Sequence, residues 1–177
     1  IHLGYCCGVA ALYEFFPLWL VDVGGYDARQ IALVNMGMCA LMTTAALFAG
    51  HASRVEGRLR AGWYAAVAAS AVLCVGFGNL WIGIAGIVLF GAPHAFYNTA
   101  LQTWSADEFA QHGQGSVMAL LSTIFCLANI LMALAGAVLT LVDTRLVLVV
   151  GGLLAAWASV GLRRWSARNP HPHLENA

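Results

Sequence analysis

The sequence contains no lysine, and charged residues of all kinds make up only 9% of its 177 positions. Eight arginines balance eight carboxylates, so the formal net charge is zero. Domains that bind nucleic acid carry a basic patch or stripe, and this composition does not supply one. We therefore expect no nucleic acid among the partners.

The sequence also lacks the common motifs of nucleotide, metal and acyl chemistry. It has no P-loop, no His-Glu-x-x-His pair and no Gly-x-Ser-x-Gly turn. Its cysteines lie in apolar runs without metal-ligand spacing or a disulfide framework, and we interpret them as small buried hydrophobes. They are Cys6, Cys7, Cys39, Cys74 and Cys126. These absences predict no catalytic residue, no metal and no cofactor, and they argue against an enzyme.

What the sequence has in abundance is apolar residues. They account for 61% of the chain, with a mean hydropathy of +0.79, whereas soluble domains are about 45–50% apolar. A membrane-spanning helix needs about 20 mainly apolar residues, and six segments qualify. We expect an all-α membrane protein with transmembrane helices at about 3–23, 30–50, 61–78, 80–104, 115–139 and 145–162.

We make separate predictions for the two ends of the sequence. Residue 1 is not methionine and the first apolar run has no basic leader, which indicates a piece of a longer protein rather than a signal peptide. Residues 1–164 are expected to form one six-helix unit. The polar stretch 165–177 is expected to be a disordered tail, and metal binding by its His171 and His173 is the less favoured alternative.

The arginines are divided unequally between the two sides that six crossings create. Six lie on one side and two on the other, and the positive-inside rule makes the richer side cytoplasmic. The larger set is Arg54, Arg58, Arg60, Arg163, Arg164 and Arg168, and the smaller is Arg29 and Arg145. We expect a multi-pass cell membrane protein with a cytoplasmic C-terminus. Arginine without lysine, beside abundant alanine and glycine, favours a bacterial inner membrane.

Polarity within the six segments recurs every three segments. The first and fourth are the most polar and contain Pro17 and Pro93, the second and fifth are intermediate, and the third and sixth are nearly pure hydrocarbon. Repeats of three crossings have opposite orientations, and such 3+3 inverted repeats are typical of secondary transporters. The third and sixth segments are expected to be the outer, lipid-facing helices.

The stretch GHASRVEGRLR (50–60) resembles the cytoplasmic loop between the second and third helices of each half in the major facilitator superfamily, Gly-x-x-x-Asp-Arg-x-Gly-Arg-Arg/Lys. Gly50, Gly57, Arg58 and Arg60 match, whereas Arg54 stands where the family has Asp. Residues 93–139 also resemble the passage from the fourth to the fifth helix of a half. The resemblance is to the C-terminal six-helix half, and it implies a missing N-terminal six-helix half of the same protein.

Glu14 is the first candidate for a solute and proton pathway. A carboxylate within a span costs several kcal/mol unless it is paired or hydrated. We interpret Glu14 as a proton-coupling or solute-contacting acid, with a structural interhelical hydrogen bond as the alternative. The resemblance supports this choice, because the first and fourth helices of a family half line the solute path.

The fourth segment supplies the second group of candidates. His94, Asn98 and Gln102 recur every four residues on one helix face. We expect them to line a cavity, with a hydrogen-bonded helix–helix seam as the alternative. Asn35 and Asn129 in the second and fifth segments are further candidates, although asparagines at such positions more often form interhelical hydrogen bonds.

Two further roles concern conformational change. Pro17 and Pro93 each remove a helix hydrogen bond, which predicts a hinge or else a fixed bend. On the cytoplasmic side, Arg54 or Arg58 is expected to pair with Asp107 or Glu108 as a latch. The gate loop then comprises Gly50, Arg54, Gly57, Arg58, Arg60, Asp107 and Glu108.

These patterns together predict secondary active transport of a small solute across the lipid bilayer by alternating access. Protons are the expected coupling ion, with Glu14 and His94 as the titrating groups. An intramembrane enzyme that uses the same two residues, or a non-transporting membrane subunit of the same fold, is the alternative.

Overall fold

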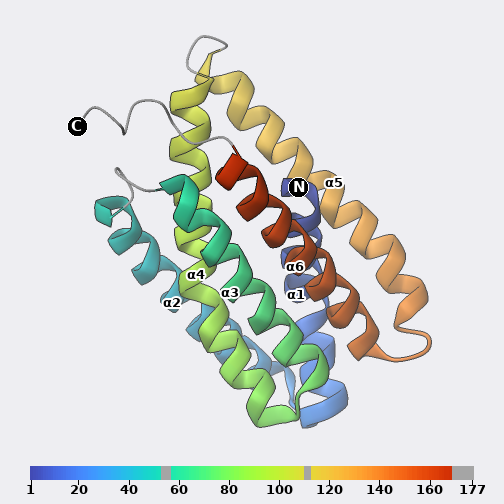
Figure 1. Ribbon diagram of the computed structural model, residues 1–177. Coiled ribbons are helices and arrows are strands. Elements are labelled where there is room, and N and C mark those ends of the chain that lie inside the picture. The colour runs from blue at the N-terminus through green and yellow to red at the C-terminus, as the bar shows by residue number, and fades with distance from the viewer. Residues whose placement is uncertain (53–56, 110–112, 169–177) are drawn as a thin grey trace.

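A computed structural model of the chain describes residues 1–52, 57–109 and 113–168. These residues form six helices and no strand (Figure 1). All six are long and apolar enough to cross a membrane, which confirms the expected all-α architecture. The helices are α1 (His2–Gly24), α2 (Ala28–Ala52), α3 (Gly57–Phe77), α4 (Leu80–Glu108), α5 (Gln114–Leu139) and α6 (Thr144–Arg168).

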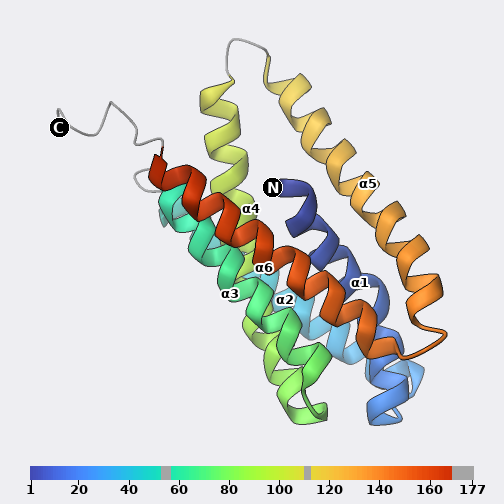
Figure 2. The same ribbon diagram turned by 45° about the vertical axis from the view of Figure 1, so that its right-hand side comes forward.

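The helices alternate in direction, so that the described arginines fall at two ends of the bundle (Figures 1 and 2). Arg29 and Arg145 lie in the first turns of α2 and α6, at the end with the α1–α2, α3–α4 and α5–α6 turns. The opposite end, called here the arginine-rich end, carries Arg60 and the last turns of α6. The arrangement agrees with the division of arginines expected from six crossings.

The helices pack as two repeats of three helices each, α1–α3 and α4–α6. Helix α1 packs mainly against α6 and α5, α4 packs mainly against α3 and α2, and α3 and α6 pack against each other. Exchanging α1 with α4, α2 with α5 and α3 with α6 leaves this pattern unchanged. Helices α1 and α4 also each contain an interior proline, Pro17 and Pro93. The repeat expected from polarity is therefore present in the packing.

Short turns between helices are fixed by local hydrogen bonds. The backbone N–H of Gln30 donates to Asp27 Oδ1 at 2.8 Å, and that of Asp27 donates to Gln30 Oε1 at 2.9 Å, which is a capping box at the start of α2. Gly25 ends α1 with φ of +64°, a left-handed conformation that favours glycine. Between α3 and α4, the Ile82 N–H donates to Asn79 Oδ1 at 3.0 Å. The two-residue break at 78–79 therefore separates two helices.

Small residues allow α1 and α6 to approach closely. A Cβ added to Gly8 would lie 2.7 Å from the Gly151 carbonyl oxygen and 2.6 Å from the Ala155 Cβ. A Cβ at Gly4 would likewise meet the Leu154 carbonyl oxygen at 3.3 Å. Membrane helices associate largely through such close packing, because lipid removes the hydrophobic drive between them.

Two helices extend beyond the expected ends. Helix α4 continues to Glu108 rather than stopping near 104, and α6 continues to Arg168, so the expectation of a disordered tail from 165 is wrong for 165–168. Hydropathy detects only the part of a helix that suits hydrocarbon, and nothing in 105–108 or 165–168 breaks a helix. Arg168 also favours the last turn, where a cation interacts well with the helix dipole. Residues 169–177, with both tail histidines, lie outside the described part.

The third and sixth segments, expected to be the outer helices because they are the least polar, are not the least buried ones. Helices α3 and α6 are substantially buried against each other through alanine and glycine, with Trp63 and Trp157 on their outer faces. The least buried are α2 and α5, whose exposed apolar side chains include Met36, Phe48 and Leu134. Composition alone does not distinguish an apolar face that contacts lipid from one that contacts another helix.

Candidate functional site

The candidate site is a cavity of about 320 Å³ between α1, α4 and α5. It lies in the half of the bundle nearer the arginine-rich end, since it uses the first turns of α1, the second half of α4 and the first half of α5. Its wall contains both polar and apolar side chains. The lining residues are His2, Tyr5, Cys6, Val9, His94, Asn98, Leu101, Gln102, Met118, Leu121, Ser122, Phe125 and Cys126.

His94 is the centre of the polar network in this cavity. Its side chain is buried, and both ring nitrogens have partners at 3.0 Å: the Tyr5 hydroxyl at Nδ1 and the Asn98 Nδ2 at Nε2. An amide nitrogen only donates, so Nε2 accepts and Nδ1 carries the proton that it donates to Tyr5. Rotating the Asn98 amide by half a turn would present its oxygen to Nε2 instead. The same three side chains therefore fit either a neutral or a doubly protonated imidazole.

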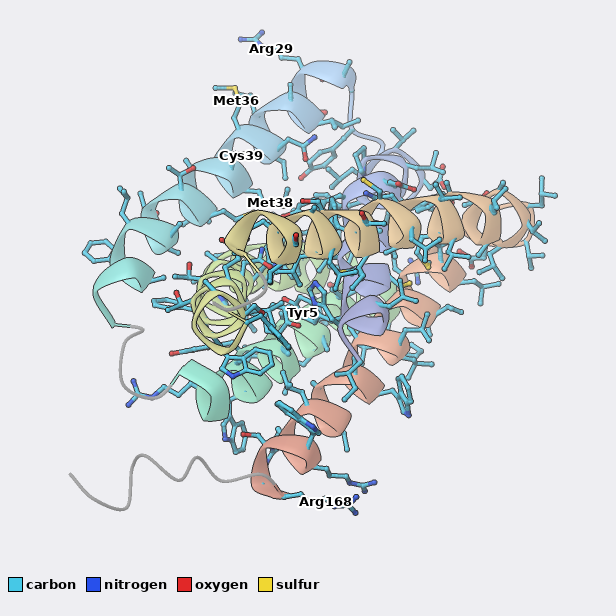
Figure 3. All side chains as sticks on the ribbon, turned by 90° about the horizontal axis from the view of Figure 1, so that it is seen from above. Tyr5, Arg29, Met36, Met38, Cys39 and Arg168 are labelled. Carbon is cyan, nitrogen blue, oxygen red and sulfur yellow. The ribbon has the colours of Figure 1, made fainter. Side chains whose placement is uncertain are left out.

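A second layer of aromatic and polar groups holds this network in place. The Tyr5 and Tyr97 rings are 3.9 Å apart at their centroids, and the Phe90 ring stacks on His94 at 4.9 Å. The Tyr97 hydroxyl lies 3.0 Å from His2 Nδ1, which extends the network toward the start of α1. Figure 3 shows Tyr5 near the middle of the bundle, whereas Met36 and Arg29 lie on the outer side of α2.

The structure brings together some of the expected pathway residues and separates others. His94, Asn98 and Gln102 all line the cavity. Glu14, Asn35 and Asn129 do not line it, and Glu14 is exposed on another face of α1.

The expected hinge and gate residues lie in or between helices. Pro17 and Pro93 are interior to continuous helices. Gly50 belongs to α2, and α3 begins at Gly57. Arg60 is exposed, Arg54 lies outside the described residues, and so do the side chains of Arg58, Asp107 and Glu108.

Sequence reasoning overlooked Ser122 and Cys126 on α5 and, on α1, the cavity residues His2, Tyr5 and Cys6. The three α1 residues recur with Val9 at spacings of three or four residues on one face of α1, which was the available signal. The interpretation of cysteines as buried hydrophobes holds for Cys6 and Cys7. It is wrong for Cys39 and Cys126, which are exposed. Within the described ranges, no three His, Cys, Asp or Glu side chains are grouped as metal ligands.

We predict that Tyr5→Phe destabilises the protein by about 1–3 kcal/mol, because it leaves a buried imidazole N–H without its acceptor. Thermal unfolding of the purified protein in detergent measures this loss. The matched control is Tyr13→Phe, which removes only a hydroxyl that donates to Met42 Sδ at 3.3 Å. Equal melting temperatures for the two variants would contradict the role of Tyr5.

Comparison with known protein families gave a match to one family model. The chain matches the family model described as Major Facilitator Superfamily over residues 1–177. Neither the curated proteins nor the solved structures gave a match. Members of this family transport small solutes across lipid bilayers, and the six spans agree with a multi-pass membrane protein. The chain belongs to the major facilitator superfamily.

Proposed function

We propose that this chain is the C-terminal half of a secondary active transporter that moves a small solute by alternating access, coupled to protons. The observation that carries the proposal is the cavity between α1, α4 and α5, with the buried His94–Tyr5–Asn98 network at its wall. Buried polar side chains within membrane spans are costly, and they commonly mark solute and ion paths.

Glu14 supports the coupling part of the proposal. It makes no side-chain hydrogen bond or ion pair with another described residue, and it is exposed together with Leu18 and Val21. These three residues share the side of α1 that faces away from its packed neighbours. A carboxylate that faces hydrocarbon there would cost several kcal/mol. Glu14 is therefore more stable in contact with water or with another six-helix unit of the protein. Glu14 at such a boundary is suited to exchange protons as the path opens and closes.

The exposed faces of α2 and α5 support the missing N-terminal half. Among the described residues of α2 only Met38, Ala45 and Ala49 are buried. A second six-helix body on this side would cover α2 and α5 and enclose the pathway beside Glu14. In the same proposal the protein lies in a bacterial inner membrane, with the arginine-rich end and the C-terminus in the cytoplasm.

The gate loop remains part of the proposal. Gly57 and Arg58 at the start of α3, and Asp107 and Glu108 at the end of α4, belong to helix termini at the arginine-rich end. An exposed ion pair there contributes about 0–1 kcal/mol, which is enough to shift the ratio of two conformations several-fold.

The test uses the complete protein in proteoliposomes with an imposed pH gradient. The vesicles are incubated with a metabolite extract, and their contents are read by mass spectrometry against protein-free vesicles. We expect at least one solute to accumulate only when protein and gradient are both present. Accumulation without any dependence on the gradient would contradict proton coupling. Conversion of a solute into a new compound, without accumulation, would instead favour the intramembrane enzyme.

A further inference from the structure

We infer that the part of the solute held in the α1–α4–α5 cavity is uncharged, carries both a hydrogen-bond donor and an acceptor, and is attached to an apolar body. A primary amide on a small ring or short alkyl chain has this chemistry. The inference rests on the proposed function, because it names the solute class of the same cavity.

The charge of the cavity wall is the first argument. Among the described residues that line it, none is an arginine, an aspartate or a glutamate. The His94 ring is neutral in this arrangement, because Asn98 Nδ2 donates to its Nε2. An ion held against the buried part of this wall, at Tyr5, Val9 and His94, would lose hydration without gaining an opposite charge from these residues, which is unfavourable. The cavity therefore selects against carboxylates and ammonium groups.

The second argument concerns which polar groups remain available. Both nitrogens of His94 already have partners, and the Tyr5 hydroxyl is used in that network. In contrast, the side chains of Gln102 and Ser122 are exposed at the cavity wall and make no hydrogen bond to another described residue. An amide side chain offers two donors and an acceptor, and a hydroxyl offers one donor and an acceptor. A solute that both donates and accepts matches this pair, on α4 and α5 respectively.

The third argument is the apolar remainder of the wall. Leu101 comes from α4 beside Gln102, and Leu121 and Phe125 come from α5 on either side of Ser122. Val9 and Met118 extend the same surface. Ligand sites are commonly apolar with a few polar groups that fix orientation. A ring or short alkyl chain would fit against these side chains while its polar group reaches Gln102 and Ser122.

The test measures binding to the complete purified protein by thermal stabilisation, without a membrane gradient. The probes are matched triplets of carboxamide, carboxylate and amine on one skeleton, beginning with benzamide, benzoate and benzylamine at neutral pH. We expect the carboxamides to raise the melting temperature and the charged members to leave it unchanged. Stronger stabilisation by the charged members, or none by any carboxamide, would overturn the inference.

Variants locate the binding. Gln102→Leu and Ser122→Ala should each weaken carboxamide binding about three- to tenfold, the value of one neutral hydrogen bond. Thr123→Val is the matched control on α5, because Thr123 does not line the cavity and its hydroxyl donates to the Ala119 carbonyl at 2.8 Å. Melting without probe verifies that each variant is folded. Equal affinities for Ser122→Ala, Gln102→Leu and Thr123→Val would place the binding elsewhere and overturn the inference.

The two proposals fail in different ways. Carboxamide binding without gradient-driven accumulation in vesicles would leave the cavity assignment intact and remove the proposed function. Gradient-driven accumulation of a charged solute, with no carboxamide bound, would support the function and overturn the assignment.

Discussion

Replacing Glu14 with Gln is expected to reduce gradient-driven accumulation to the level seen without a gradient. Glutamine keeps the size and hydrogen-bonding capacity of the side chain but cannot bind or release a proton at neutral pH. Glu14 is the carboxylate that lies midway along α1, and no other described side chain forms an ion pair with it. The measurement is uptake into proteoliposomes of the solute identified from the extract, with and without the gradient.

Exchange of labelled for unlabelled solute, at equal pH on both sides, separates coupling from general damage. Glu14→Gln should retain this exchange, because exchange needs the path but no net proton movement. The matched control is Asp27→Asn, which removes a carboxylate at the turn between α1 and α2, outside the spans. Unchanged accumulation in Glu14→Gln would refute the coupling role.

Replacing Gly8 with Ala is expected to cause a large loss of folded protein. The added methyl group would meet the Gly151 carbonyl oxygen at 2.7 Å, and a backbone atom cannot move aside as a flexible side chain does. The helices would have to separate along the α1–α6 contact. Overpacking of this kind costs about 1–3 kcal/mol, and the larger Gly8→Leu change should exceed that range. Yield of monodisperse protein and its melting temperature measure the effect.

Two glycines provide controls for the intrinsic effect of Gly→Ala in a helix. A Cβ added to Gly37 in α2 or to Gly115 in α5 would have no atom within 4 Å in this chain. Alanine is favoured over glycine in a helix by about 1 kcal/mol. Gly37→Ala and Gly115→Ala should therefore be neutral or stabilising. A Gly8→Ala protein as stable as these two would show that the α1–α6 contact tolerates a wider spacing.

The number and type of the helices were predictable from sequence because the bilayer imposes one requirement. Every backbone polar group in hydrocarbon must be satisfied within its own segment, so an apolar run of about 20 residues becomes a helix. Even the turn at Gly78 and Asn79 separates two helices as expected. The ends of α4 and α6 were less predictable, because a helix can continue past the hydrocarbon wherever the sequence contains no helix-breaking residue.

The candidate site was predictable only in part. His94, Asn98 and Gln102 share a helix face, and that spacing placed them together correctly. Nothing local linked His94 to Tyr5, which is 89 residues away in sequence and whose hydroxyl on α1 accepts the hydrogen bond from His94 Nδ1. Glu14 appeared to belong with His94 because both lie in polar spans, yet they occupy different surfaces.

The sequence by itself determined that this chain crosses a membrane six times, how its helices alternate, and which faces are polar. These properties depend on transfer energies and helix periodicity, which act within each segment. The tertiary structure alone decided which polar faces meet, because that depends on how closely helix pairs approach. The contact of Gly8 with Gly151 sets one such distance, and the enclosure of His94 by Tyr5 and Asn98 is decided at the same level.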